Sequence, residues 1–244
     1  MPSFLRKFLT SLVAGLTVAA LLLVLGNSGT IPWFPPVVVF SLVGLSLFAS
    51  LMFPFLWQYR ERKQAIDSTA VYAILLAIIR YSIAVNIATF GWKKLLGLQF
   101  LVPPEVASRP MNQQPGEILT WFYFGYSPIF GTLIALIQLV GAYFLLFRRT
   151  FLLSSIVLFA LIFNIALVNV FYHLNAGALT QGIILTLGLL FLILTEYPRL
   201  VVFFLVDEPL LPEGKQRNTV LKNTVRFSAI GLSLLFVYCI SRIY

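Results

Sequence analysis

The chain has 244 residues, of which 60% are hydrophobic and only 10% are charged. A typical soluble domain is about half apolar and about a quarter charged, so this composition excludes an ordinary soluble protein. The 17 lysines and arginines outnumber the 8 acidic residues, and the formal net charge is +9. On a soluble protein such a charge would suggest nucleic acid. Here the basic residues stand beside long apolar segments, so we interpret them as a topology signal and expect no nucleic-acid partner.

Seven apolar segments are long enough to be membrane spans, because about 20 such residues cross the hydrocarbon core of a bilayer. Backbone polar groups inside a bilayer must be satisfied within the chain, so we expect the spans to be helices. The sequence therefore predicts an all-α, multi-pass membrane protein. The predicted spans are Phe8–Leu25, Val37–Trp57, Thr69–Phe90, Ile129–Phe147, Phe151–Tyr172, Ala178–Leu194 and Phe227–Ile240.

The distribution of basic residues predicts the orientation in the membrane. With a cytoplasmic N-terminus, twelve of the 17 basic residues fall on the inner side, four fall on the outer side, and Arg80 lies inside a span. Seven spans then place the C-terminus outside. Arg6 and Lys7 precede the first apolar segment, as in a signal peptide, but no clear cleavage site follows. We therefore expect this segment to be retained.

The connections between spans differ in character. Residues 27–36 form a predicted outer turn, and residues 58–68 form a charged inner linker. The longest connection, Trp92–Pro128, ends in an aromatic segment too short to span, which we expect to pack as a helix on the core or in the headgroup layer. Near the C-terminus, Leu200–Val206 is also too short to cross, and Asp207–Asn223 is a predicted inner polar segment.

Arg80 is the most informative polar residue, because a charge inside a membrane span is costly unless it has a partner or a function. It lies about 16 Å into its predicted span. One interpretation is that its side chain reaches the inner surface. The other is a polar site shared with Gln138, in which Arg80 binds backbone carbonyls, a lipid phosphate or an anionic ligand. Lys94 lies 14 residues later, on the same predicted helix face.

Further polar residues are predicted in the outer halves of the third and fifth spans: Asn86, Asn164, Asn169, Tyr172 and His173. With Gln138 of the fourth span, we expect them to gather between three adjacent helices. Two interpretations stay open: hydrogen bonds between helices, or a small solvated pocket that opens outward.

No arrangement of residues predicts catalysis or a cofactor. His173 is the single histidine, so a bis-histidine haem site is impossible, and no acidic cluster accompanies it. The single cysteine, Cys239, excludes an intrachain disulfide and a Cys-x-x-Cys redox centre. We expect no catalytic residues, no metal and no cofactor.

Four passages follow one another in a characteristic order. They are Arg80-Tyr81 with Phe90-Gly91-Trp92-Lys93-Lys94 and Gln99-Phe100; Trp121-Phe122 through Gly125-Tyr126-Ser127; Leu145-Leu146-Phe147-Arg148-Arg149-Thr150; and Asn164 with Asn169 and Tyr172. In this order they resemble the DoxX-like family of bacterial integral membrane proteins, and most closely its larger members with extra flanking spans. Arg60-Glu61-Arg62-Lys63 resembles the basic turn that precedes the core in those members.

The resemblance implies a four-helix transmembrane core over residues 69–200. Residues 1–68 would then hold two flanking spans and the basic linker, and residues 201–244 the polar segment and the last span. Two positions depart from the family: Gln138 stands where relatives carry Glu, and His173 stands where they carry Asp. Members of the family are associated with thiosulfate:quinone oxidoreduction or with membrane-bound oxidoreductase complexes.

Three functions stay open at this point. The first is a non-enzymatic subunit that anchors or organises membrane or periplasmic partner subunits in the bacterial inner membrane. The second is a quinone-linked oxidoreductase component, which would need a redox partner. The third is a transporter or lipid-binding protein that uses Arg80 as an intramembrane anion site.

Overall fold

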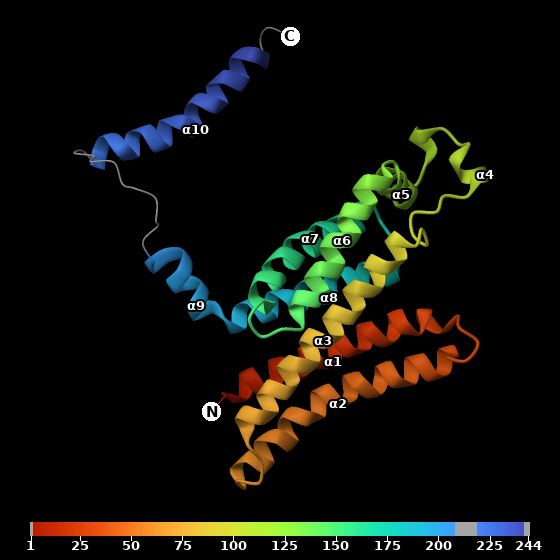
Figure 1. Cartoon of the computed structure of the whole chain (residues 1–244), viewed down its shortest axis with the longest axis vertical. Helices are drawn as coiled ribbons and strands as arrows, with labels where there is room; N and C mark the ends of the chain where they lie inside the picture. The colour runs from red at the N-terminus through yellow and green to blue at the C-terminus, as the bar shows by residue number, and fades with distance from the viewer. Residues whose placement is uncertain (1, 208–218, 242–244) are drawn as a thin grey trace. The chain divides into compact units, whose positions relative to one another are not determined.

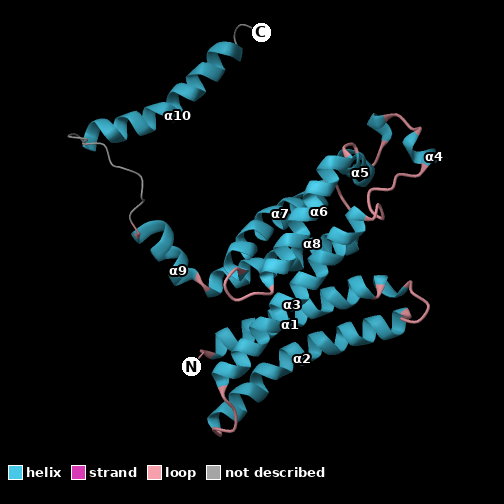
Figure 2. Cartoon of the chain, in the orientation of Figure 1, coloured by secondary structure: helices cyan, strands magenta, loops and turns pink. Residues whose placement is uncertain are grey.

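The computed structural model describes residues 2–207 and 219–241, and within these ranges the chain is helical, with no β-strand (Figures 1 and 2). The elements are α1 (Phe4–Leu25), η1 (Asn27–Gly29), α2 (Pro36–Arg62), α3 (Ser68–Leu95), α4 (Pro104–Ala107), η2 (Met111–Gln113), α5 (Gly116–Gly125), α6 (Pro128–Leu145), α7 (Phe151–Phe171), α8 (Ala176–Thr195), α9 (Tyr197–Val201), η3 (Val202–Val206) and α10 (Thr219–Ser241).

Six of the described helices are long and apolar enough to cross a membrane: α1, α2, α3, α6, α7 and α8. The chain is therefore an all-α, multi-pass membrane protein, and six of the seven predicted spans are confirmed as helices of sufficient length and apolar composition. The seventh, Phe227–Ile240, falls within α10, which is a helix but not one of these six. That span stays a prediction.

The chain divides into two compact units, residues 1–198 and 199–244. The segment Leu200–Val206, which the sequence predicts to be too short to cross a membrane, is helical. It belongs to the apolar helical stretch Tyr197–Val206, which is shorter than the six long helices. Most of the predicted polar segment Asp207–Asn223 lies outside the described residues. All contacts described below belong to the first unit.

Short polar side chains begin several of the helices. Asp67, Ser127 and Asn175 precede α3, α6 and α8, and each accepts a hydrogen bond from a backbone N–H of the first turn. Such N-caps satisfy donors that have no partner within the helix. They fix the helix starts within one or two residues of the predicted spans.

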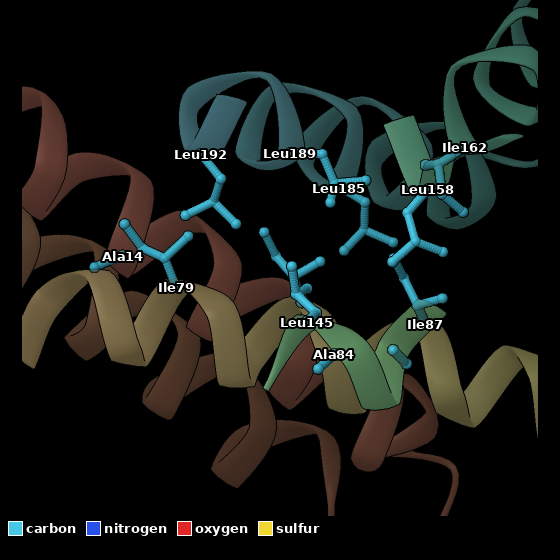
Figure 3. Close-up of a cluster of buried hydrophobic side chains, with 12 residues drawn as sticks. Ala14, Ile79, Ala84, Ile87, Leu145, Leu158, Ile162, Leu185, Leu189 and Leu192 are labelled. Carbon is cyan, nitrogen blue, oxygen red and sulfur yellow. The ribbon is translucent and has the colours of Figure 1, made fainter. Parts of the chain in front are cut away.

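The buried core of the first unit draws on five helices. α1 packs on α2, α3 and α8, while α3 packs on α6 and α7 packs on α8. Figure 3 shows apolar side chains that converge from these helices. The residues of this core include Ala14 of α1, Ile83 of α3, Leu145 of α6, Leu158 of α7 and Leu189 of α8. The first helix thus belongs to the same core as the four helices of residues 69–200.

Small residues let the helices approach closely. An added Cβ at Gly15 of α1 would meet the Cβ of Ser50 of α2 at 2.3 Å. Nearby, the hydroxyl of Ser46 donates to the Gly15 carbonyl at 3.0 Å. On α7, the hydroxyl of Ser154 donates to the carbonyl of Gly141 on α6 at 2.6 Å. Such contacts replace the hydrophobic effect as the source of attraction between helices in lipid.

The long connection is folded, as the sequence predicts. We call the end of the first unit that carries residues 96–127 the connector end, and the end with Arg148 and Arg149 the basic end. The aromatic segment forms α5, which packs on α6. The Phe124 ring stacks on Phe100 at 5.5 Å between centroids, and Trp121 is half-buried. Tyr123 and Tyr126 are exposed.

Candidate functional site

Arg80 binds the end of a neighbouring helix. Its Nε donates to the carbonyl oxygen of Leu145 at 3.0 Å, and a second guanidinium nitrogen donates to the carbonyl of Leu146. Carbonyls at a helix C-terminus have no partner within the helix, and they carry partial negative charge. The guanidinium also lies 5.2 Å from the centroid of the Phe151 ring. Arg80 therefore has a structural partner at the basic end of α6.

Arg80 and Gln138 make no direct hydrogen bond with each other in the described part of the chain, and a partly hydrated site shared by the two stays a prediction. Arginine has no acceptor atom, so a direct bond would have to use the Gln138 side-chain oxygen. That oxygen is buried and has no hydrogen-bond partner among the described residues. The physical reason is position: Gln138 lies seven residues, or about 10 Å, before Leu145 along α6. The guanidinium reaches the helix end instead.

A buried amide network joins three helices. Asn86 of α3 donates to the side-chain oxygen of Gln181 on α8 at 3.1 Å. Gln181 in turn donates to the main-chain carbonyl of Ala20 on α1 at 2.8 Å. The side-chain oxygen of Asn86 is left without a partner among the described residues. Sequence reasoning missed Gln181, although an amide inside the apolar segment Ala178–Leu194 was an available signal.

A small cavity lies at the connector end beside Lys94. Its volume is about 60 Å³. Lys94 of α3 and Asn169 of α7 line it, together with aromatic side chains that include Trp121 and Phe124. Asn169 donates to the carbonyl of Ala178 at 2.9 Å. The structure therefore brings two of the predicted polar residues, Lys94 and Asn169, to one cavity.

A larger cleft of about 850 Å³ adjoins this cavity. The two share four lining residues: Gln99, Phe100, Trp121 and Leu174. Apolar residues of α1 and α2 form part of the cleft wall, and Lys93, Glu117 and Gln181 supply polar groups. Glu117 accepts a hydrogen bond from Asn175 at 3.0 Å, which ties α5 to the start of α8.

Other predicted residues lie elsewhere. Tyr172 and His173 follow α7 and are exposed, and neither lines the cavity or the cleft. The main-chain oxygen of Tyr172 would lie 2.3 Å from an added Cβ at Gly116, so this turn packs tightly on α5. Asn164 of α7 is exposed, whereas Asn169 is buried. Five residues turn a helix by about 500°, so the two amides point about 140° apart.

Asn164 belongs to an exposed row along α7, which we call the α7 stripe. Its members are Leu153, Val157, Ala160, Asn164, Leu167 and Phe171. Within residues 2–207 and 219–241 the side chain of Asn164 makes no hydrogen bond. The neighbours of α7 in the first unit are α6 and α8, and the stripe faces away from both.

A buried ion pair lies at the basic end, where the sequence suggests only topology signals. Lys7 of α1 is 1% exposed, and its ammonium group contacts Glu61 of α2 and donates to Gln58 at 2.6 Å. The hydroxyl of Ser68 also donates to Glu61, and the Trp57 indole donates to Ser68 at 2.8 Å. This cluster holds α1, α2 and the start of α3 together. Its residues are up to 61 positions apart in the sequence, so no local pattern predicts the cluster.

Comparison with known proteins gives a relative but no function. The chain is similar to YwoB. This uncharacterized protein of Bacillus subtilis (strain 168) is 29% identical over 112 residues, which cover 46% of this chain and 71% of the relative. No family model matches the chain, and no solved structure matches it. The DoxX-like resemblance therefore stays a prediction.

Proposed function

We propose that this chain is a non-enzymatic subunit of an assembly in the bacterial cytoplasmic membrane, where it organises partner subunits through α7. The observation that carries the proposal is the α7 stripe with an unbonded amide, Asn164, inside a membrane span.

The spacing of the stripe is that of a helix-packing seam. Its members alternate steps of four and three residues from Leu153 to Phe171. A repeat of this kind keeps one narrow face of a helix directed at a neighbouring helix over its whole length. In lipid, association of that kind depends on packing and on hydrogen bonds between helices.

Asn164 favours contact between the α7 stripe and another helix. It lies seven residues from the end of α7, which is about 10 Å into the hydrocarbon region. An amide there finds no water, and a bond to a polar group of another helix is worth about 0.6–2 kcal/mol. One polar residue within an otherwise apolar seam also fixes the register of the two helices. A polar residue at the same depth of a partner helix would provide both.

The two ends of the first unit differ in charge and in aromatic content, which favours one orientation in the membrane. The basic end, with Arg148 and Arg149, would face the cytoplasm, and the connector end, with α5, would face the periplasmic or outer side. With a seventh span in α10, the C-terminus would be outside. The exposed aromatic residues Tyr123 of α5 and Tyr126, which follows α5, suit either a headgroup layer or a periplasmic partner subunit.

The alternative functions have less support. An anion site at Arg80 competes with the carbonyls of Leu145 and Leu146, which its guanidinium already binds. A quinone-linked role rests on the DoxX-like resemblance alone.

Photocrosslinking from α7 tests the proposal. A benzophenone amino acid at position 164 should form adducts with another membrane polypeptide in cells. The same amino acid at Leu136, an exposed residue of α6, is the matched control and should give lipid adducts. Adducts from position 164 only with lipid, or only with residues 219–241 of the same chain, would contradict a subunit role.

A further inference from the structure

The cavity beside Lys94 holds two polar groups that the protein does not satisfy. We propose that this cavity and the adjoining cleft bind a phosphate ester that carries a hydroxyl group, such as the headgroup of an anionic phospholipid. This inference does not depend on the subunit role of α7.

The first of the two groups is the ammonium of Lys94. It lies 5.9 Å and 5.7 Å from the ring centroids of Phe90 and Phe100. Among the described residues it has neither an ion pair nor a hydrogen bond. Aromatic faces attract a cation but do not accept its three N–H donors. A phosphate oxygen would accept from them and would balance the charge.

The second group is the side-chain oxygen of Gln99. It is buried and has no hydrogen-bond partner among the described residues. It is an acceptor, so a fully ionised inorganic anion cannot satisfy it, whereas a hydroxyl group can. Water could donate to Gln99 but would leave the charge of Lys94 unbalanced. The pair of groups therefore selects a ligand with both an anionic oxygen and an O–H donor.

The size and position of the two spaces suit an amphiphile. A water molecule needs about 10–15 Å³ of such space, so a cavity of about 60 Å³ accepts a phosphate-sized group. The cleft of about 850 Å³ reaches from there to Leu23, Val24 and Phe40 of two membrane helices, where acyl chains would lie. In the cleft, Lys93 and Glu117 carry opposite charges.

Binding of short-chain lipids to the purified, full-length chain tests this proposal. Native mass spectrometry would count bound dioctanoyl phosphatidylglycerol, which has a phosphate and two hydroxyls. Dioctanoyl phosphatidylcholine, which has the phosphate but no hydroxyl, is the lipid control. We expect phosphatidylglycerol to bind at least about tenfold more tightly, because only it satisfies both Lys94 and Gln99.

Three variants locate the site. Lys94→Gln should weaken phosphatidylglycerol binding about tenfold, and Lys94→Arg should largely preserve it. Lys63→Gln is the matched control and should have no effect, since Lys63 is also stacked on an aromatic ring, 4.4 Å from that of Tyr59, but at the basic end. Gln99→Leu should weaken binding while raising the melting temperature, because it removes a buried acceptor without a partner. A purely structural role for Gln99 would instead lower the melting temperature.

Glycerol 3-phosphate separates the two sources of this chemistry. If it binds as tightly as the lipid and Lys94→Gln abolishes that binding, the cavity is confirmed and the natural ligand is a free phosphate ester. Weak binding of glycerol 3-phosphate with tight binding of the lipid supports a membrane phospholipid. Equal affinity of phosphatidylglycerol and phosphatidylcholine, or equal affinity of the wild-type and Lys94→Gln chains for phosphatidylglycerol, would overturn the proposal.

Discussion

Arg80 on α3 and Leu145 at the end of α6 are joined by a hydrogen bond of 3.0 Å from the guanidinium to a main-chain carbonyl. A second guanidinium nitrogen binds the next carbonyl, that of Leu146. The two guanidinium nitrogens thus donate to two carbonyls at the end of α6, to which no side chain of α6 itself donates. The costly intramembrane charge is thereby explained through structure, without a ligand.

Replacing Arg80 by Leu should lower the free energy of unfolding by about 1–3 kcal/mol, because it leaves two carbonyls at the end of α6 without donors. Denaturation by SDS in mixed micelles measures this quantity. Arg109→Gln is the control, since Arg109 is exposed in the long connection. Equal stability of the Arg80→Leu and Arg109→Gln chains would show that the bonds to Leu145 and Leu146 contribute nothing.

The buried pair of Lys7 and Glu61 predicts strong non-additivity. Lys7→Met alone should cost about 3–5 kcal/mol, because it leaves the Glu61 carboxylate partly buried without its cation. The double variant Lys7→Met/Glu61→Met should cost less than Lys7→Met alone. The same SDS denaturation would measure all three chains. Additive losses would mean that the pair does not act as a unit.

The close contact at Gly116 indicates that α5 packs tightly against the turn after α7. An alanine there would place its Cβ 2.3 Å from the Tyr172 carbonyl oxygen, so α5 must shift. We expect Gly116→Ala to cost about 1–3 kcal/mol and to make the connection around α5 easier to cleave by protease. Gly44→Ala is the control, because an added Cβ at Gly44 meets nothing within 4 Å. Similar cleavage of both variants would contradict the packing of α5.

Much of the fold could be predicted because lipid imposes one simple rule on long apolar segments. Six predicted spans are confirmed as long apolar helices, and the short aromatic helix α5 is confirmed as well. The sequence predicts backbone carbonyls among the partners of Arg80, but it does not show which ones, because a backbone carbonyl carries no signal in the sequence. The pair of Lys7 and Glu61 is 54 residues apart, so no local periodicity relates them.

The candidate site could be predicted only in part. Lys94 and Asn169 meet at one cavity, but helix rotation decides which amides face inward, and apolar helices say little about rotation. Asn164 is an example. The sequence places it in the same half of the membrane as Asn169, yet the two side chains lie on different sides of α7. The turn of about 140° between them was the available signal.

The predicted orientation can be tested by cysteine labelling in a Cys239→Ala background. A membrane-impermeant maleimide applied to intact cells should label a cysteine at Thr30 or Ser108, because both connections belong to the predicted outer side. A cysteine at Lys63, or at Lys215 outside the described residues, should react only after the membrane is opened. Labelling of a cysteine at Lys63 in intact cells would show that the chain has the reverse of the predicted orientation.

The most direct test of the subunit role is the mass of the assembly after gentle detergent extraction. The chain alone has a mass of 27.4 kDa. We predict that the wild-type chain elutes in a larger protein complex by size-exclusion chromatography with light scattering. Asn164→Leu should shift it toward the mass of the single chain. Phe163→Leu, an exposed position of α7 beside the stripe, should not. A wild-type chain that is monomeric, or a complex that Asn164→Leu leaves intact, would contradict the account.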